Sequence, residues 1–183
     1  MIATEPLFAE WFETPLGDMV AAADDAHLYF LEFRDAATRE KTLASLEARS
    51  HRPVVYRRNR VIDQIGTELE DYFAGKSASF STPLAPEGSD FEKNVWAELL
   101  KVPLGETCSY GDIARAVGGM ETVRAVGKAN GANPIAIVIP CHRCIGTDGS
   151  LTGYGGGLWR KKWLLRHEGQ MRPIGLFALG DPR

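Results

Sequence analysis

The residues with the clearest chemical potential are a cysteine, a histidine and an arginine in succession, Cys141, His142 and Arg143. The apolar β-branched run 137–139 precedes them, and Pro140 separates the two groups. This pattern predicts a buried strand that ends where the backbone turns out of the core. A thiol at such a corner is accessible from one side only, which suits a nucleophilic cysteine. The alternative is a small buried cysteine with a satisfied polar neighbour.

A second cysteine, Cys144, follows three residues after Cys141 and creates a formal C-x-x-C spacing. That spacing is compatible with a redox pair or with half of a zinc site. The chain has only one other cysteine, Cys108, so there is no second pair to complete such a site. We therefore predict no metal and no cofactor, with Cys144 filling an apolar site. A disulfide between Cys141 and Cys144 that blocks the reactive thiol remains a hypothesis.

Length and composition limit the class of protein. The 183 residues, 44% hydrophobic and 25% charged, fit one large domain or two small ones with an ordinary core. No apolar run approaches the roughly 18 residues of a membrane span. The segment 1–13 is acidic and aromatic, unlike a targeting peptide. Three sparse cysteines indicate reduced thiols. Together these features predict a cytoplasmic protein without membrane contacts. We also expect it to be a monomer.

Charge is distributed unevenly along the chain. The net charge is −3, but residues 1–89 carry 9 basic against 15 acidic residues, whereas residues 90–170 carry 10 against 8. The second half is therefore the candidate for an anionic partner, although an excess of this size is also typical of a solvated face.

Periodicity in the first half predicts mixed α and β structure. Runs 19–23 and 27–33 read as a hairpin, 54–56 as a further strand, and 35–48 and 61–73 as helices. Gly75 ends the second helix. The segment 77–90 is rich in serine, proline and glycine and reads as a linker, which predicts a domain boundary near residue 88.

The second half reads as mainly helical. Ser89 or Asp90 caps a helix over 91–100. Two short helices, 110–117 and 122–130, flank Gly118 and Gly119 in a helix-turn-helix outline. The second of them presents polar residues among small ones, which lets a helix approach a nucleic-acid backbone. A glycine-rich loop, 151–157, then precedes a last amphipathic helix over 158–167, with Glu168 and Gly169 at its end.

Several motifs in the second half occur together in one order. They are Phe91 to Trp96, Pro103 to Thr107 with Ser109 to Gly111, Val123 to Gly127, Ala132 to Pro134, Ile139 to Arg143, Gly153 with Tyr154, and His167 to Gly169. This set closely resembles the O6-alkylguanine-DNA alkyltransferases, also called methylated-DNA–protein-cysteine methyltransferases, of the Ogt and Ada carboxy-terminal kind. The resemblance covers most of residues 91–169 and extends more faintly to Thr14–Gly17 and 69–75.

The resemblance implies an α+β fold. A small RNase-H-like α/β domain over 1–88 would precede a mainly helical domain over 89–170, which carries the helix-turn-helix and the active-site cysteine, and 171–183 would form a tail. The amino-terminal zinc cysteines of some relatives have no counterpart here, because no cysteine precedes Cys108.

The resemblance also implies an activity: single-turnover transfer of the alkyl group from O6 of guanine, and also O4 of thymine, to Cys141. Free cysteine, with a pKa of about 8.5, is mostly protonated at neutral pH. The family assigns removal of that proton to His142, acting through a water and held by Glu168. Tyr110 would protonate the leaving guanine, and Asn133 would brace the active-site turn.

The partner implied is double-stranded DNA containing O6-alkylguanine, whose target base must be rotated out of the stack. Arg124 corresponds to the family's arginine finger, which fills the vacated space. The residues expected to contact DNA are Arg124, Tyr110, Thr122, Lys128 and Asn130. The residues expected to line the substrate pocket are Tyr154, Gly155, Gly156 and Cys144, the last of which stands where the family usually has valine.

Two other functions fit parts of the sequence. An alkyltransferase-like protein would bind alkylated DNA without transfer, but such proteins replace the reactive cysteine, which is present here. A redox or structural thiol protein using Cys141 and Cys144 would explain neither Arg124 nor Tyr110.

Overall fold

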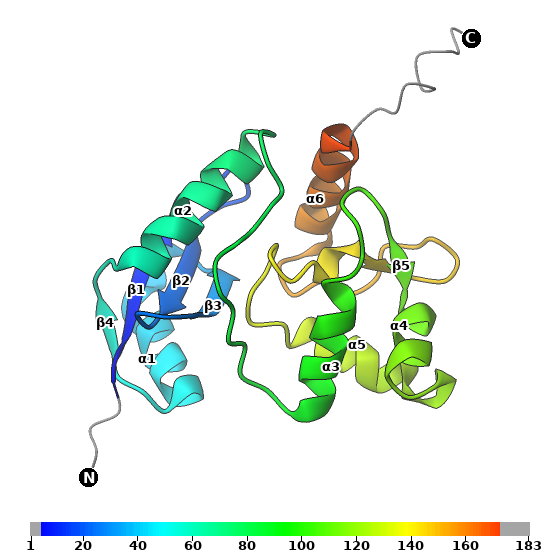
Figure 1. The fold of residues 1–183 in the computed structure, drawn as a ribbon, viewed down its shortest axis with the longest axis horizontal. Helices are drawn as coiled ribbons and strands as arrows, with labels where there is room; N and C mark the ends of the chain where they lie inside the picture. The colour runs from blue at the N-terminus through cyan, green and yellow to red at the C-terminus, as the bar shows by residue number, and fades with distance from the viewer. Residues whose placement is uncertain (1–4, 173–183) are drawn as a thin grey trace, which may run out of the picture.

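The computed structural model describes residues 5–172, which form two units lying side by side (Figure 1). A β-sheet with two helices makes up the first unit, and four helices with a two-stranded sheet make up the second. The predicted α+β fold is confirmed. No helix among the described residues is long and apolar enough to cross a membrane.

The first unit is built on a four-stranded mixed sheet with the order β3-β2-β1-β4. Its strands are β1 (Leu7–Phe12), β2 (Met19–Ala23), β3 (Leu28–Phe33) and β4 (Val54–Tyr56). The predicted hairpin is confirmed, because β2 pairs antiparallel with both β1 and β3. The strand β4 pairs parallel with β1, which requires a crossover through helix α1 (Arg39–Ser50).

The two faces of this sheet belong to different cores. Leu46 of α1 packs with one set of strand side chains, including Trp11 and Phe30. The opposite face packs against helix α2 (Arg60–Phe73) and also against apolar residues of the second unit. Strand side chains alternate between faces, so one sheet serves both cores. The two units therefore share buried apolar surface.

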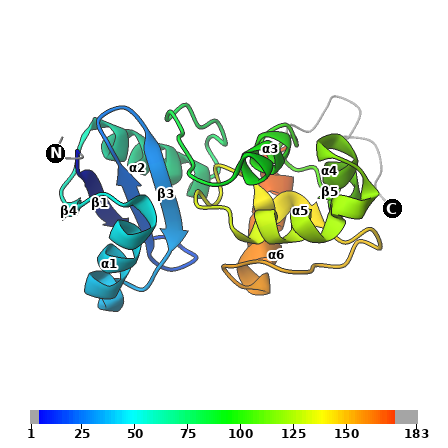
Figure 2. The same ribbon diagram turned by 90° about the horizontal axis from the view of Figure 1, so that it is seen from below.

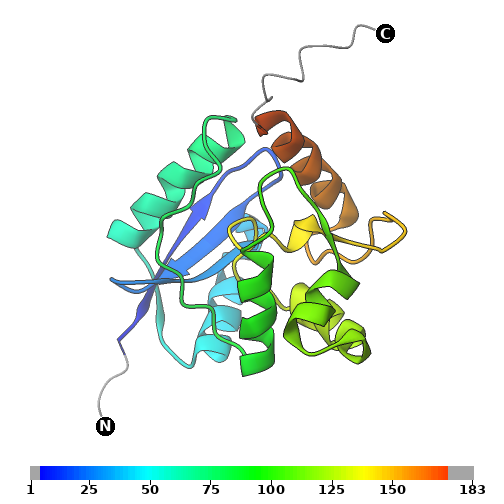
Figure 3. The same cartoon turned by 45° about the vertical axis from the view of Figure 1, so that its right-hand side comes forward.

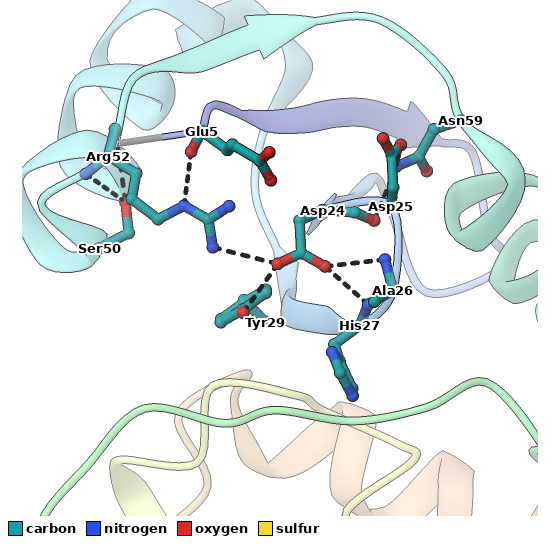
Figure 4. Close-up of polar contacts among 9 residues, drawn as sticks. All are labelled: Glu5, Asp24, Asp25, Ala26, His27, Tyr29, Ser50, Arg52 and Asn59. Atoms are coloured by element: carbon teal, nitrogen blue, oxygen red, sulfur yellow. Dashed lines mark hydrogen bonds and ion pairs between the residues drawn. The ribbon is translucent and has the colours of Figure 1, made fainter. Parts of the chain in front are cut away.

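The turn between β2 and β3 is held by one carboxylate, that of Asp24 (Figure 4). Its Oδ1 accepts from the backbone N–H groups of Ala26, at 2.9 Å, and His27, at 2.8 Å. Its Oδ2 accepts from the Tyr29 hydroxyl at 2.8 Å and from Arg52 at 3.2 Å. Burial by itself would raise the pKa of Asp24, but these four donors outweigh it and lower the pKa. The Asp24 network thus joins the hairpin to the segment that leads into β4.

The predicted linker runs between the units in an extended path (Figure 1). Leu84 forms a parallel bridge with Leu28 at the start of β3. Glu68 of α2 accepts hydrogen bonds from the side chains of Ser81 and Thr82, both at 2.7 Å. The segment is therefore fixed to the first unit. The expected boundary near residue 88 stays a prediction.

The second unit contains four helices (Figures 2 and 3): α3 (Asp90–Leu99), α4 (Tyr110–Val117), α5 (Val123–Gly131) and α6 (Leu158–Met171). Ser89 caps α3, as predicted, in a reciprocal capping box with Glu92. Trp96 of α3 is buried and donates its indole N–H to the Ala129 carbonyl of α5 at 2.8 Å. Strands β5 (Cys108–Ser109) and β6 (Cys144–Ile145) pair in parallel.

The predicted strand over 137–139 is wrong. These residues are buried but form turns, with the Val138 N–H bonded to the Ala136 carbonyl and the Ile139 N–H to the Ile135 carbonyl. Ile137 adopts φ 72°, a left-handed conformation that is rare for a β-branched residue. The apolar run 137–139 correctly predicted that these residues are buried, but such a run does not by itself distinguish a strand from buried turns.

The last helix is longer than predicted. It continues to Met171, so Glu168 and Gly169 lie within it rather than at its end. Arg172, which belongs to the predicted tail, forms an ion pair with Glu106 at 3.2 Å. Residues 173–183 of that tail lie outside the described residues.

The Asp24 network predicts a local stability effect. Asp24→Ala leaves two backbone N–H groups, Tyr29 and Arg52 without their shared acceptor, so we expect the free energy of unfolding to fall by about 2 kcal/mol. Urea denaturation measures this. Asp25→Ala is the matched control, because exposed Asp25 accepts only a 3.3 Å hydrogen bond from Asn59, and should change stability by less than about 0.5 kcal/mol. Equal losses in both variants would contradict the assigned role.

Candidate active site

Cys141 begins a short 3-10 turn, η3 (Cys141–Arg143), directly after Pro140. Its side chain is buried, with 6% of the residue exposed. The thiol residue lines a cavity of about 160 Å³. The predicted corner is therefore present, although turns rather than a strand lead into it.

Asn133 holds those turns together. Its amide Nδ2 donates to the Ile139 carbonyl at 2.8 Å, and its Oδ1 accepts from the Ile135 N–H at 3.0 Å. The strained residue Ile137 lies between these two anchor points. A non-glycine residue in such a conformation costs about 1–3 kcal/mol, so the surrounding contacts must over-determine it. Asn133 supplies two of them.

His142 and Glu168 form a fully buried hydrogen-bonded pair. His142 Nε2 lies 2.7 Å from Glu168 Oε1. Arg143 donates its Nε to Glu168 Oε2 at 2.7 Å and its Nη2 to Oε1 at 3.0 Å. Tyr72 of the first unit also donates to Oε1, at 3.0 Å. The predicted contact between His142 and Glu168 is present. Sequence analysis singled out Arg143 without giving it a role at Glu168, and it did not identify Tyr72.

Burial and pairing act in opposite directions on these groups. Burial by itself would raise the pKa of Glu168, but hydrogen bonds from His142 and Arg143, together with their charge, hold that pKa at about 2. Burial lowers the pKa of His142, while Glu168 opposes that change. Burial raises the pKa of Cys141, opposed by the Asn133 amide and by the charge of Lys161. At neutral pH the resting state is a thiol next to a neutral imidazole and an ionised carboxylate.

These charges decide the tautomer of His142. An ionised carboxylate only accepts hydrogen bonds, so the ring nitrogen facing Glu168, Nε2, must carry the proton. The lone pair is then on Nδ1, which is buried and has no hydrogen-bond partner among the described residues. Nδ1 is therefore the atom of His142 that can accept a proton.

The cavity at Cys141 has walls from both units. The lining residues are Glu32, Phe33, Arg34, Asn130, Gly131, Asn133, Ala136, Cys141, Tyr154, Gly155 and Gly156. The structure thus brings the predicted pocket residues Tyr154, Gly155 and Gly156 to the thiol. Burial and then the charge of Cys141 raise the pKa of Tyr154. The wall contributed by the end of β3 was not predicted, because no sequence pattern connects residues so far apart.

Two predicted assignments require correction. Asn130, expected on the DNA-facing surface, is 3% exposed and directs its amide Nδ2 to the Cys141 carbonyl at 3.4 Å. It follows the buried face of α5 rather than the exposed one. Cys144, expected in the substrate pocket, does not line the cavity at Cys141. It is fully buried and pairs in register with Cys108 across β5 and β6.

The pairing changes the thiol chemistry expected of Cys144. A hydrogen bond with Cys108, followed by burial, raises the pKa of Cys144, and the same hydrogen bond lowers the pKa of Cys108. The thiol that interacts most strongly with Cys144 is therefore Cys108. The hypothesis of a disulfide between Cys141 and Cys144 stays untested.

Tyr110 starts α4 and is not among the residues that line the cavity at Cys141. Its hydroxyl donates to the Thr152 carbonyl at 3.1 Å. Burial, together with the charge of Cys144, raises its pKa to about 12, so it remains a hydrogen-bond donor at neutral pH. Tyr110 lines a second hollow of about 390 Å³ between the helix pair and the loop after β6. Of the predicted catalytic residues, Cys141 and Asn133 line the first cavity, Tyr110 lines the second hollow, and the buried His142 and Glu168 line neither.

The predicted helix-turn-helix is present as α4, a glycine turn and α5, with the short turn η2 (Met120–Thr122) before α5. Gly119 adopts φ 124°, which only glycine adopts readily. Arg124 and Lys128 are exposed on α5, and Thr122 is half-buried at its start. A Cβ added at Gly127 would meet no other atom within 4 Å. This face of α5 is consequently open for close approach.

Lys161 is a buried residue that sequence reasoning missed. Its ammonium group donates to the carbonyls of Cys144, at 2.6 Å, and Thr152, at 2.8 Å. Burial lowers the pKa of Lys161. It shares the buried face of α6 with Leu164 and Glu168, and this three- and four-residue spacing was the available signal. Lysine was passed over because it is rarely buried.

No group of three or more histidine, cysteine or acidic side chains within residues 5–172 is arranged to hold a metal ion. The expected monomeric state and cytoplasmic location stay predictions.

The fold and the site together define a protein that places a buried thiol, a histidine and a carboxylate beside a helix-turn-helix. Residues 7–86 match the family model of the 6-O-methylguanine DNA methyltransferase ribonuclease-like domain, and residues 90–170 match that of the DNA-binding domain of the same family. The chain belongs to the 6-O-methylguanine DNA methyltransferase family, and the predicted family is thereby confirmed.

Curated relatives and solved structures agree with that membership. A methylated-DNA–protein-cysteine methyltransferase of Methanosarcina acetivorans is 42% identical over 158 residues, covering 86% of this chain and 96% of the relative. One from Salmonella typhimurium is 41% identical, covering 90% and 97%. The structure of a Mycobacterium tuberculosis O6-methylguanine methyltransferase superposes with a TM-score of 0.76 at 36% identity, covering 95% and 99%. The Mycobacterium tuberculosis enzyme in complex with DNA gives a TM-score of 0.76 at 37% identity, covering 94% and 99%.

The lowered pKa of Glu168 predicts how stability depends on pH. Because its pKa is about 2 in the folded chain against an ordinary 4.5, its contribution is complete above about pH 4.5 and is lost as the pH falls from there toward 2. We expect Glu168→Gln to lower the free energy of unfolding at pH 7 by on the order of 3 kcal/mol, and the difference from wild type to shrink below pH 4.5.

Urea denaturation at pH 7, 5, 4 and 3 tests this expectation. Glu98→Gln is the control, because Glu98 forms a surface ion pair with Lys101; such pairs contribute about 0–1 kcal/mol. A Glu168→Gln deficit that stays constant from pH 7 to pH 3 would contradict the assignment.

Proposed function

We propose that this protein repairs alkylated DNA directly by moving the alkyl group from O6 of guanine to the sulfur of Cys141. The observation that carries the proposal is the placement of Cys141, in a cavity next to the buried His142–Glu168 pair and beside an exposed helix-turn-helix face. Membership in the 6-O-methylguanine DNA methyltransferase family supports it.

The first step is activation of the thiol. Burial keeps Cys141 protonated and His142 neutral, so the proton must move from sulfur to the free lone pair on Nδ1, through a bridging water as the resemblance implies. The imidazolium that forms is stabilised by the Glu168 carboxylate, 2.7 Å from Nε2. Arg143 keeps that carboxylate ionised. The arrangement is that of a nucleophile, a base and an orienting group.

The second step is an in-line displacement at carbon. The thiolate forms the new S–C bond as the C–O6 bond breaks, and the electron pair of that bond stays with the guanine. Tyr110, whose raised pKa keeps its hydroxyl protonated, would donate a hydrogen bond or proton to the leaving base. The resulting thioether does not hydrolyse, so each molecule acts once.

We further propose that α5 meets the DNA. A base inside a duplex cannot present O6 in line with a buried thiol, so the nucleotide must leave the stack, which requires a few kcal/mol. Arg124 is exposed on the open face of α5 and is long enough to occupy the vacated space. Thr122 and Lys128 would contact the backbone, and Tyr154 with Gly155 and Gly156 would line the site of the rotated base.

A mass measurement tests the transfer. Incubation with a duplex that contains O6-methylguanine should add one methyl group to the wild-type protein, located by peptide mapping at Cys141. Cys141→Ser should bind the duplex without gaining mass, and Cys108→Ser is the control that should still be methylated. Binding without any gain of mass in the wild type would instead indicate a lesion-binding protein that does not transfer.

A separate comparison tests whether Arg124 fills the space left by the rotated base. Arg124→Ala should slow single-turnover transfer from duplex DNA by about tenfold or more, because an energy on the order of 1–2 kcal/mol that stabilises the rotated base is lost. Transfer from the free base O6-benzylguanine should be nearly unchanged. Lys41→Ala, on the exposed face of α1, should leave both rates unaltered. Full-speed transfer from duplex DNA by Arg124→Ala would remove Arg124 from this role.

A further inference from the structure

We propose that Tyr72, a residue of the amino-terminal unit, is a positioning residue for alkyl transfer: its hydroxyl orients the Glu168 carboxylate that holds His142. The inference rests on the proposed function and extends it across the two units. Tyr72 is the last but one residue of α2, and Glu168 lies in the last turn of α6. The ends of these helices lie side by side at the top of Figures 1 and 3.

Four hydrogen bonds from three residues hold the Glu168 carboxylate, and three of them end on one oxygen. Oε1 of Glu168 accepts from Tyr72 at 3.0 Å, from His142 at 2.7 Å and from Arg143 at 3.0 Å, while Oε2 accepts from Arg143 at 2.7 Å. An ionised carboxylate offers about two lone pairs on each oxygen, so three donors share Oε1 while Oε2 receives one. Glu168 and Tyr72 are both fully buried. Removal of the Tyr72 hydroxyl therefore leaves Oε1 to two donors, His142 and Arg143, so the catalytic histidine shares that oxygen with one donor fewer.

The hydroxyl is a permanent donor. Burial, followed by the negative charge of Glu168, raises the pKa of Tyr72 far above its ordinary value. Tyr72 therefore keeps its proton at neutral pH. The contact cannot reverse its direction, because an ionised carboxylate has no proton to donate.

A second contact fixes where the hydroxyl lies. The carbonyl of Tyr72 is 2.6 Å from His167 Nε2, and the two rings meet edge to face at 5.2 Å. Phe73 packs against Trp163, which stacks on His167. The end of α2 is thus attached to α6 both by its backbone and by its aromatic side chains. The hydroxyl can direct Glu168 because its own backbone is held.

The titration of His142 reports this role. The pKa values of His142 and Tyr72 depend on the groups around them. These are Glu168 and Lys161 from α6, Arg143 from η3, Tyr72 itself from α2, and Tyr154 from the glycine-rich loop. Loss of the Tyr72 hydroxyl leaves more negative charge on Oε1 for His142. The protonated imidazole then gains stability, so the pKa of His142 rises and its neutral form is lost at a higher pH than in the wild type.

Tyr72→Phe tests the proposal, because it removes only the hydroxyl. We expect single-turnover methyl transfer from an O6-methylguanine duplex to slow by about tenfold at pH 7, with DNA affinity unchanged. In histidine-labelled protein, which has only four histidines, NMR should show the His142 pKa raised by about half a unit. The pH at which transfer reaches half its maximal rate should rise with it.

Tyr29→Phe is the matched control. It removes a tyrosine–carboxylate hydrogen bond of 2.8 Å to Asp24 (Figure 4), within the first unit. It should destabilise the fold to a similar extent while leaving the transfer rate and the His142 titration unchanged. The proposal would be overturned if Tyr72→Phe, like Tyr29→Phe, left the transfer rate or the pKa of His142 at the wild-type value. A residue with a purely structural role would change the stability of the fold and neither of these quantities.

The wild-type protein supplies an independent measurement should Tyr72→Phe fail to fold. The Tyr72 hydroxyl proton should give a slowly exchanging NMR signal with a nuclear Overhauser contact to Hε2 of His142, since both protons point to one oxygen. Absence of that contact would reject the proposal. Absence of methyl transfer by the wild type would instead reject the proposed function, so the two failures are distinguishable.

Discussion

The buried carboxylate of Glu168 is the group on which the rest of the site depends. An unpaired charge at that depth would be strongly destabilising, and the fold supplies donors from three residues of two elements, α2 and η3, to compensate it. Once compensated, the charge fixes the tautomer of His142 and leaves Nδ1 as its only free lone pair. A stability requirement and a catalytic requirement are therefore met by the same hydrogen bonds.

This arrangement explains why the chain needs both units. The amino-terminal sheet uses one face for its own core with α1 and the other for a core shared with the second unit. The shared core places the end of β3 against the cavity at Cys141 and the end of α2 against α6. The sheet is consequently part of the wall and of the support of the site, although the thiol and its base both come from the second unit.

The approach to Cys141 shows how local strain is supported. Ile137 adopts a left-handed conformation that is unfavourable for β-branched residues, and its side chain is almost completely buried. Asn133 bonds to the backbone on both sides of it. The chain can then turn sharply before Pro140 and present the thiol to the cavity instead of to the interior. Strain of this kind persists only where its surroundings over-determine it, and here they do so directly next to the reactive residue.

Most local features followed from the sequence alone. The hairpin, the cap of α3, the glycine after α2, the helix-turn-helix and the order of the motifs around Cys141 depend on neighbouring residues, whose propensities and spacing can be interpreted from the sequence alone. The family resemblance rested on the same motifs. The apolar run 137–139 was correctly expected to be buried but wrongly expected to be a strand, because apolar character reports the environment of a residue and not its backbone conformation.

Only the tertiary structure determined which residues from distant parts of the chain contact one another. Only the packed chain reveals that Tyr72 and Glu168 share a hydrogen bond, that Cys144 faces Cys108, and that Asn130 turns inward to Cys141 while Arg124 on the same helix faces out. Lys161 is buried because three carbonyls converge on its ammonium group, an environment that residue type alone argues against. Such contacts join residues far apart in the chain, so their energies depend on packing between elements and leave no local pattern in the sequence.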